Sequence, residues 1–444
     1  MAKLRQPELV RRMKADKVKF VCLQFANIQG GVNSGIVPFD RVNTALRNGV
    51  GFDGSSVKGY ARICESDRVL APDEKTYALL PWVTDPEKKT ARLICDVHGM
   101  DGQPSLEDPR NVLKRAIVIA ANLGLVYNTG PELEFFLFKI GEDGKQIVKS
   151  AGNGTYFSND AGSPGWNMRM EIAAALKAFG IRAEMIHTEV AESQHEIAFG
   201  YSDVLRTADN AMTFKMVVRA IAAQHGYFAT FMPKPIEGVS GSGAHVHQSL
   251  WRGRKNMFAD PKGVHNLSET ALQFIAGQLE HIGWLCALTN PTVNSYKRLV
   301  PGYEAPVNAC WGRTNRSALL RVPHTADRKS VRVELRVPDP SFNPYFALAA
   351  MLRAGLDGIQ RKLNAPDPVD ENVFEMGAER RAVNGIKVVP GSLLEAITYL
   401  EKSALGKEVL GEHLFGAYIT AKRRECTEYA TQVSAWELQQ YMDY

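Results

Sequence analysis

A nine-residue stretch in the first third of the chain constrains the fold most. Residues 130–138 read GPELEFFLF, and their apolar and aromatic content between Gly-Pro and Gly141 predicts a largely buried β-strand. Side chains alternate between the two faces of a strand, so Glu132 and Glu134 share a face. Two carboxylates this close repel each other unless a cation lies between them. The alternative is a strand end at which both acids meet water.

Length and composition limit the class of protein. At 444 residues the chain is long enough for two or more domains, and 45% hydrophobic with 23% charged residues is typical of a globular protein in water. A net charge of +5 argues against a dedicated nucleic-acid binder. The six cysteines are scattered without a CxxC pair, which disfavours a zinc site or a disulfide framework and indicates the reducing cytoplasm.

The N-terminal segment does not have the pattern of a signal peptide, because residues 10–19 alternate apolar and basic residues. Since no apolar run approaches the ~20 residues of a membrane span, we expect no membrane partner.

Strand and turn signals divide the chain in two. The first hundred residues predict an amphipathic helix and then short strands, at residues 5–15, 19–25, up to 38, 76–83 and 91–97. A turn-rich segment follows, and Asp108-Pro109 is a good helix start, with Asp as N-cap and Pro at the first helical position. We therefore predict a small strand-rich domain at 1–103 and a larger domain at 104–444.

The larger domain alternates strands and helices. Helical spacing of apolar residues runs from Leu272 to Ile282, Asn343-Pro344 begins an alanine-rich helix, and residues 392–395 match a capping box. The chain is predicted to be α+β, with a mixed sheet that carries polar strand ends and is backed by helices.

A second acidic group lies in residues 187–199, where Glu192 stands between Glu189 and Glu196. Taken alone, this group is as expected for a solvated turn. A third polar group follows a glycine-rich turn, where His245, His247 and Ser249 alternate and so share one face of a strand. The turn lacks the Lys-Ser/Thr of a phosphate-binding P-loop.

The fourth polar group lies in residues 331–337, where Arg332, Glu334 and Arg336 alternate with apolar residues. An exposed face of ion pairs is the alternative here. Five glutamates and one histidine on predicted strands together indicate a divalent-metal site. Carboxylate-rich ligation favours Mg²⁺ or Mn²⁺ over zinc.

The segment from 297 to 336 is dense in cations: Lys297, Arg298, Arg313, Arg316, Arg321, Arg328, Lys329, Arg332 and Arg336. Metal carboxylates combined with guanidinium groups are typical of phosphoryl transfer from a nucleotide, because both neutralise charge in the transition state. A nucleic-acid patch is the competing interpretation, and the scarcity of interleaved aromatic residues weakens it.

The ordered motifs resemble type I glutamine synthetases, the glutamate–ammonia ligases, in their shorter unadenylylated subgroup. The matching motifs span the chain: Phe52–Ser56, Gly130–Phe135, Gln194–Glu196, Lys234-Pro235, Gly241–His245, Asn290–Pro306, Asn315–Ser317, Arg332–Arg336 and Asn343–Tyr345. The long run from 290 to 306 is the most specific of them.

The resemblance implies a β-grasp-like N-terminal domain and a catalytic domain with a curved antiparallel sheet backed by helices. It implies a homo-dodecamer of two hexamer rings with active sites between subunits. ATP would phosphorylate the side chain of L-glutamate to γ-glutamyl phosphate, and ammonia would displace the phosphate. Mg²⁺ or Mn²⁺, two or three per site, would assist.

Carried over position by position, the resemblance assigns roles to single residues. Glu134, Glu189 and Glu196 would hold one metal, and Glu132, His245 and Glu334 the other. Residues binding glutamate and its reacting group would be Ser240, Gly241, Arg298, Glu304 and Arg336. Residues serving ATP would be Glu184, His247, Ser249, Arg316, Arg321, Lys329 and Arg332, with Arg316 also catalytic.

The resemblance also assigns the amine pocket and its regulation. Asp53, with Ser56, Tyr156 and Glu189, would bind ammonium and accept its proton, while Glu304 would lie on a flap that excludes water. Arg62 matches a feedback-inhibition position. No tyrosine occurs near residues 384–390, where adenylylated relatives carry theirs, so we expect no adenylylation.

Several positions depart from the usual family pattern: Asn27, Asn33, Ser158–Pro164, Thr188 and Ser240. None of these departures removes a predicted metal ligand, but they fall near the amino-acid and amine pockets. They motivate two alternatives to glutamine synthesis. One is a γ-glutamylamide ligase that uses methylamine or another small amine, and the other is a weakly active regulatory paralogue.

Overall fold

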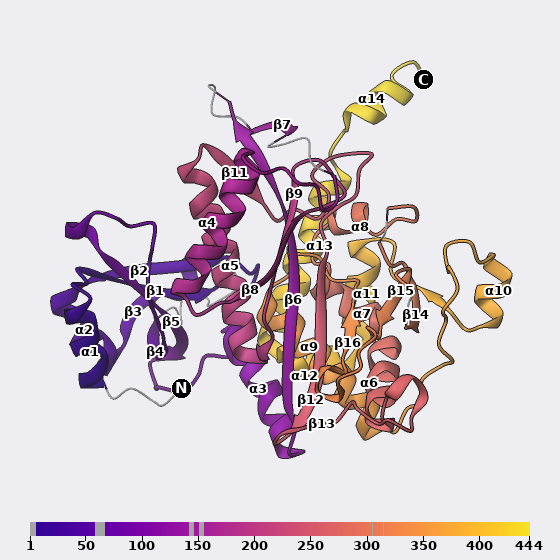
Figure 1. Ribbon diagram of the computed structural model, residues 1–444, viewed down its shortest axis with the longest axis horizontal. Helices are drawn as coiled ribbons and strands as arrows, with labels where there is room; N and C mark the ends of the chain where they lie inside the picture. Colours follow the sequence, from indigo (N-terminus) through magenta and orange to yellow (C-terminus); the bar gives the residue numbers. More distant parts are fainter. Residues whose placement is uncertain (1–5, 58–66, 142–145, 151–154, 304, 314) are drawn as a thin grey trace.

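The computed structural model describes residues 6–57, 67–141, 146–150, 155–303, 305–313 and 315–444. Figure 1 shows a small strand-rich part formed by the N-terminal residues beside a larger part built around one long central strand. This is the α+β arrangement predicted from the sequence, with a β-grasp domain followed by a catalytic domain.

The small part is a five-stranded sheet with two helices. Its elements are α1 (Gln6–Ala15), β1 (Phe20–Ala26), β2 (Val32–Pro38), α2 (Val42–Asn48), β3 (Val50–Asp53), β4 (Asp67–Leu79) and β5 (Thr90–Gly99). The strand order is β2-β1-β5-β4-β3, and only β1 and β5 pair in parallel. The strand expected at 76–83 is the end of the longer β4, and the four-residue β3 is too short for its pattern to be seen in the sequence.

The larger part contains a twelve-stranded sheet. Its strands are β6 (Val126–Ile140), β7 (Gln146–Ser150), β8 (Ala183–Thr188), β9 (Gln194–Phe199), β10 (Ser202–Asp203), β11 (Tyr227–Thr230), β12 (Ala244–Arg252), β13 (Lys255–Asn256), β14 (Asn308–Gly312), β15 (Ala318–Arg321), β16 (Val333–Leu335) and β17 (Lys387–Val388). Their order is β17-β14-β15-β16-β12-β6-β9-β8, with β7, β10 and β11 also on β6 and β13 on β12. The pairs are antiparallel except β14 with β15.

Helices surround this sheet. They are α3 (Pro109–Asn122), α4 (Pro164–Ala178), α5 (Val204–Gln224), α6 (Glu269–Glu280), α7 (Ile282–Thr289), α8 (Ser295–Arg298), α9 (Pro344–Gln360), α10 (Ala378–Val383), α11 (Leu393–Lys402), α12 (Ala404–Leu410), α13 (Glu412–Ala430) and α14 (Ala435–Tyr441). None of the helices in the described ranges is long and apolar enough to cross a membrane.

The central strand β6 separates core from site by the alternation of its side chains. Leu133, Phe135 and Leu137 are fully buried in a cluster that includes residues of α4 and α5. Glu132 and Glu134 therefore lie on the opposite face of the same strand. The helices hold β6 by its apolar face and leave its acidic face to the cavity described below.

Local signals set the helix ends. Asp108 caps α3 and Asn343 caps α9, each with proline at the first turn, as predicted. Ser392 also caps α11 by accepting from the Glu395 backbone N–H, but the Glu395 carboxylate bonds to Gly391 N instead of completing the predicted capping box. The full box lies at Ser434 before α14.

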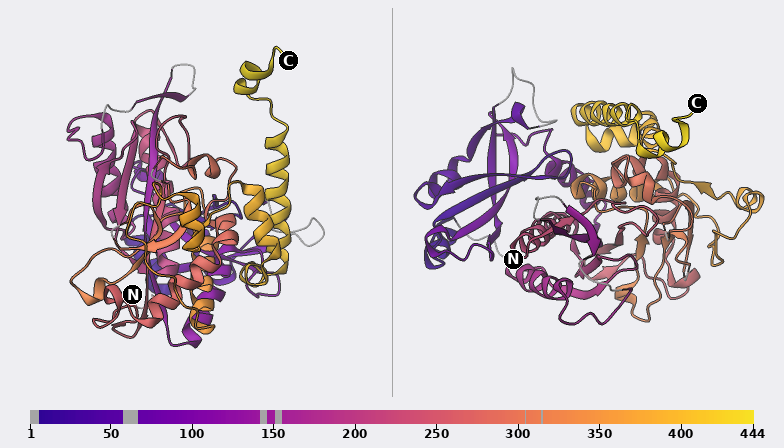
Figure 2. Two further views of the ribbon diagram at one scale, coloured as in Figure 1. Left: turned by 90° about the vertical axis from the view of Figure 1, so that its right-hand side faces the viewer. Right: turned by 90° about the horizontal axis from the view of Figure 1, so that it is seen from above.

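The last helix projects from the body of the protein, whereas the helix before it packs on the core through Leu414 and Tyr418. Figure 2 shows α13 along one side and α14 standing beyond it. None of the residues of α14 is buried.

A buried arginine joins the two parts of the chain. Arg110 on α3 bonds Asp73 of β4 through Nη2 at 2.8 Å and Asp96 of β5 through Nη1 at 2.7 Å. Its Nε and Nη2 also bond the two carboxylate oxygens of Asp209 on α5, at 3.0 and 2.8 Å. The Arg110 side chain is 2% exposed, so water cannot replace these contacts.

Replacing Arg110 by methionine should destabilise the protein by about 3–5 kcal/mol, because three carboxylates lose their shared buried partner. Chemical denaturation would measure this change. The control is Arg361→Met, which removes an exposed pair with Asp357 on α9 and should cost only about 0.5 kcal/mol. Equal effects of the two substitutions would contradict the importance of the Arg110 contacts.

Candidate active site

The register of the large sheet lines up the acidic side chains in two rows. In the first row, Glu134 of β6 lies opposite Glu196 of β9, which lies opposite His187 of β8. In the second, Glu132 of β6 lies opposite His245 of β12. Directly paired residues of antiparallel strands point to the same face, so hydrogen bonds between strands hold these groups together.

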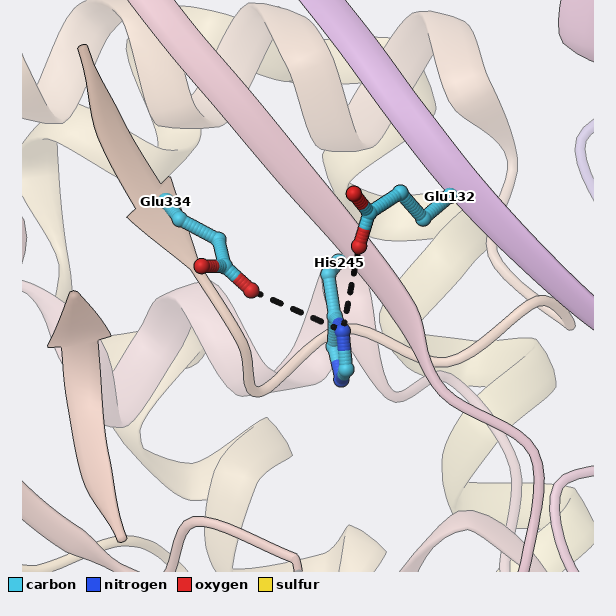
Figure 3. Close-up of side chains that lie close together, drawn as sticks. All are labelled: Glu132, His245 and Glu334. Atoms are coloured by element: carbon cyan, nitrogen blue, oxygen red, sulfur yellow. Dashed lines mark ion pairs between the residues drawn. The ribbon is translucent and has the colours of Figure 1, made fainter. Parts of the chain in front are cut away.

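The first cluster consists of Glu132, His245 and Glu334, drawn in Figure 3. His245 Nδ1 lies 3.6 Å from an oxygen of each glutamate. Glu334 comes from β16, where it pairs with His247 of β12. Two carboxylates that converge on one imidazole nitrogen form a donor set suited to a divalent cation.

The protonation states of this cluster favour ligation. Burial opposes the ionisation of Glu132, but hydrogen bonds from His245 and His247 outweigh it and lower the pKa of Glu132. Burial, reinforced by Arg336, lowers the pKa of His245, so its imidazole stays neutral. An ionised carboxylate and a neutral imidazole are the forms that bind metal ions.

The second cluster consists of His187, Glu189 and Glu196. His187 Nδ1 lies 3.4 Å from Glu189 and its Nε2 lies 3.5 Å from Glu196. Burial opposes the charged form of His187, but the contact with Glu196 outweighs burial and raises the His187 pKa. The two acids therefore favour the protonated form of His187 more than water does.

Glu134 lies beside this second cluster, and its surroundings oppose the charged form of its carboxylate. Burial, together with the charges of Glu189 and Glu196, raises the pKa of Glu134 well above its ordinary value. One of its oxygens accepts hydrogen bonds from Gln194 Nε2 at 2.7 Å and Gly243 N at 2.9 Å. These bonds fix the orientation of the Glu134 carboxylate, but neither donor carries a positive charge.

Arginines form the opposite side of the site. Glu334, 1% exposed, accepts from Arg336 Nη1 at 2.6 Å and from Arg321 Nη1 at 3.0 Å. The Nε atoms of both arginines are buried and have no hydrogen-bond partner among the described residues. Such unpaired donors are suited to an anionic ligand.

These groups line one cavity of about 450 Å³. Thirteen of the predicted site residues lie on its wall: Glu132, Glu134, Tyr156, Glu189, Glu196, Ser240, Gly241, His245, Arg298, Arg316, Arg321, Glu334 and Arg336. The structure thus brings the predicted metal ligands, amine-pocket tyrosine and glutamate-binding residues of this domain into a single space.

Other predicted residues lie outside that wall. His247 and Ser249 continue along β12, and Arg332 Nε bonds His247 Nδ1 at 3.3 Å. Glu184 lies on β8, and Lys329 is exposed on a short 3₁₀ turn. Glu304 and Arg62 lie outside the described residues.

Asp53 and Ser56 lie in the small domain, at and just beyond the end of β3. The described residues that line the cavity all belong to the large domain. Within one chain, the predicted amine-binding carboxylate is therefore not on the wall of the cavity that holds the metal-type clusters. Figure 1 shows β3 in the small part and β6 in the larger part.

Eight wall residues were not predicted as site residues, and two of them have polar side chains that contact the acids. His187 belongs to the second cluster, and Gln194 orients Glu134. His187 could have been found from its position two residues before Glu189, which puts both side chains on one face of an extended segment. Gln194 stands two residues before Glu196 on β9 and so has the same signal, but its bond to Glu134 depends on the pairing of β9 with β6.

Comparisons with known families agree with this geometry. Residues 17–100 match the β-grasp domain of glutamine synthetase, and residues 106–441 match its catalytic domain. The chain belongs to the glutamine synthetase family. Membership accounts for the two-part fold and for the acidic rows on its large sheet.

Individual relatives extend over the whole chain. The glutamine synthetase of Clostridium saccharobutylicum is 47% identical and covers 100% of both chains. That of Thermotoga maritima is 47% identical, over 98% of this chain and 99% of the relative. Among solved structures, a GmaS–ADP complex superposes with a TM-score of 0.89 at 32% identity, covering 98% of this chain and 99% of that one.

These full-length matches to glutamine synthetases support ATP-dependent synthesis of glutamine from glutamate and ammonia. They do not favour the two alternatives raised by the departures, a γ-glutamylamide ligase or a regulatory paralogue. For this glutamine synthetase family member, the departures therefore require an explanation that retains the ammonia-dependent reaction.

The raised pKa of Glu134 predicts how stability changes with pH when metal is removed. An acid whose pKa is higher in the folded than in the unfolded protein contributes stability at pH values below its unfolded pKa. This contribution is lost as the pH rises through the folded pKa. In chelator, the melting temperature should fall as pH rises above the ordinary range in which a glutamic acid ionises. Glu134→Gln should flatten this fall, because the neutral amide removes the repulsion.

The same variant should gain less melting temperature from added Mn²⁺ than the parent protein. Glu171→Gln, which changes an exposed glutamate paired with His225, is the control and should leave both responses unchanged. An unchanged pH slope in Glu134→Gln would contradict the proposed electrostatic strain.

Proposed function

We propose that the two clusters of the cavity each hold a divalent cation, Mg²⁺ or Mn²⁺, during glutamine synthesis. Glu132, His245 and Glu334 would hold one. Glu134, Glu189 and Glu196 would hold the other, with His187 beside them. The raised pKa of Glu134 supports this assignment, because a cation would remove its repulsion from Glu189 and Glu196. When bound, such ions polarise phosphate oxygens and offset their charge, and a third ion per site is compatible with the carboxylate count.

ATP would approach along β12. Three of the residues assigned to the nucleotide lie on the side of the first cluster: His247, Ser249 and Arg332. The other two that lie outside the cavity wall are Glu184 and Lys329. Arg316 and Arg321 line the cavity between them and the substrate. Their guanidinium groups would stabilise negative charge on the transferring phosphoryl group. The ADP in the GmaS structure supports nucleotide binding on this fold.

L-Glutamate would occupy the wall formed by Ser240, Gly241, Arg298 and Arg336. The absence of a side chain at Gly241 is required there, because a Cβ would lie 2.3 Å from Pro233 O. Because Gly241 has no side chain, its backbone can lie close to Pro233 and leave room for a substrate beside Arg298. The Arg298 side chain is buried and donates to Val337 O at 2.8 Å. Glu304 is assigned to the flap over this wall by resemblance.

In the first step, the glutamate γ-carboxylate oxygen attacks the terminal phosphorus of ATP, and ADP leaves. In the second, ammonia attacks the acyl carbon of γ-glutamyl phosphate, the C–N bond forms, and the bond from that carbon to the phosphate oxygen breaks. Asp53 would bind ammonium with Ser56 and Tyr156 and accept its proton. The Asp53 carboxylate is exposed and already held by Ser55 and Ser56, whose hydroxyls donate to it at 2.7 and 3.0 Å.

The amine pocket would be completed by a second subunit. Asp53 does not reach the cavity of its own chain, so a homo-oligomer that places the small domain of one subunit against the large domain of its neighbour would complete each site. A dodecamer of two hexamer rings is the assembly we propose. Exposed apolar side chains on the projecting α14, including Trp436 and Leu438, support further subunit contacts. We propose the cytoplasm as its location.

The acidic rows and their match to glutamine synthetases carry the proposal. Phosphate release from ATP with glutamate and Mg²⁺ tests it, with ammonium, methylamine, ethylamine or no amine. Ammonium should be preferred at millimolar concentration. Preference for an alkylamine would support the γ-glutamylamide ligase, and no turnover with any amine would support the regulatory paralogue.

Mixing two inactive variants tests the shared site. Asp53→Ala removes a proposed site residue of the small domain only, and Glu134→Ala removes one of the large domain only. Oligomers reassembled from a 1:1 mixture should recover activity in about one site in four, because random neighbours restore that fraction of interfaces. Asp53→Ala alone and Glu134→Ala alone, reassembled in the same way, are the controls. No recovery after verified mixing would argue that Asp53 acts within its own chain or not at all.

A further inference from the structure

Thr188 holds a short turn, residues 155–158, against the sheet next to the second cluster. The Thr188 hydroxyl donates to Thr155 O at 2.7 Å and accepts from Ser158 N at 3.0 Å. The Thr188 carbonyl accepts from Phe157 N at 3.1 Å. Thr188 is the last residue of β8 and is 3% exposed, so the sheet side of these three bonds is buried.

The turn between these bonds has a strained backbone. Phe157 has φ of +56°, a left-handed conformation that bulky residues rarely adopt. Such conformations cost about 1–3 kcal/mol and persist when their surroundings hold them. Phe157 is held by its bond to Thr188 and by its ring, which stacks on His187 with centroids 4.4 Å apart and planes at 22°.

This conformation determines where Tyr156 lies. The Tyr156 ring meets the His187 ring edge-on, with centroids 5.6 Å apart, and lines the cavity beside Glu189 and Glu196. The Tyr156 side chain is about half exposed, and its described ring contacts are with Phe157 of the turn and with His187, on which Phe157 also stacks.

The far end of the same loop is anchored separately. Asp160 accepts from Arg169 Nη2 at 2.5 Å and from Ser163 Oγ at 2.8 Å. Arg169 Nη1 in turn lies 2.8 Å from Nδ1 of the buried His195, the neighbour of Glu196 on β9. Both ends of the loop are therefore fastened to the two strands that carry the second cluster.

Thr188 and the 158–164 segment are among the positions that depart from the usual family pattern, and their contacts give these departures a common role. We propose that Thr188 is a positioning residue for the amine subsite, fixing the 155–158 turn so that Tyr156 closes the pocket to amines larger than ammonia. The inference rests on the proposed function, because it takes Tyr156 as part of that subsite. Thr188 itself does not touch the reacting atoms.

The decisive comparison is Thr188→Val, which keeps the shape and removes the hydroxyl, against Thr188→Ser, which keeps the hydroxyl. In the full oligomer, Thr188→Val should raise KM for ammonium about tenfold, the effect of losing roughly one buried hydrogen bond. KM for glutamate, KM for ATP and Mn²⁺ affinity should change little. The ratio of methylamine to ammonium turnover should rise, and Thr188→Ser should stay near the parent values.

The matched control is Thr213→Val on α5, a buried threonine whose hydroxyl donates to Asp209 O at 2.8 Å away from the loop. It should leave KM for ammonium and the amine ratio unchanged. Phe157→Gly provides a second test, because glycine adopts the left-handed conformation without strain while the stack on His187 is lost. It should also raise KM for ammonium.

Parent-like ammonium KM and amine ratio in both Thr188→Val and Phe157→Gly would overturn the inference, as would an equal rise in the KM values for all three substrates. Absence of ammonium-dependent turnover in the parent protein would instead overturn the proposed function. The two failures are therefore distinguished within one set of assays.

Discussion

The repulsion of Glu134 on β6 by Glu189 and Glu196 is the constraint on which this structure depends. Glu134 is held among these acids by a strand whose other face is packed into the core through Leu133, Phe135 and Leu137. Glu134 cannot turn away from the neighbouring acids without pulling apolar side chains into water. Burial of the apolar face thus supplies the free energy that keeps like charges together.

Much of this arrangement could be predicted from the sequence, for a physical reason. Alternation along one strand is a local property, so residues 130–138 predicted both a buried strand and a shared acidic face. Caps at Asp108 and Asn343 are local too, and they were correct. The resemblance to the family added the partners of each acid, which single-strand patterns could not provide.

What could not be predicted depends on contacts between distant segments. The place of His187 beside Glu196 is set by the register of β8 on β9, and the role of Gln194 by the register of β9 on β6. The Ser392 capping box failed because Gly391 offered the Glu395 carboxylate a competing N–H. The role of Thr188 could not be predicted either, because its hydroxyl bonds to a turn about thirty residues earlier in the chain.

Glu334 has a consequence for how ligands communicate. The same carboxylate faces His245 in the first cluster and accepts hydrogen bonds from Arg321 and Arg336. A cation held as proposed by Glu132, His245 and Glu334 would compete for the Glu334 oxygens, and both guanidinium groups would then be more available to an anion. By thermodynamic linkage, an anion that captures the arginines must strengthen cation binding by the same factor. Cation and anion occupancy are then coupled through one side chain, with no change of fold required.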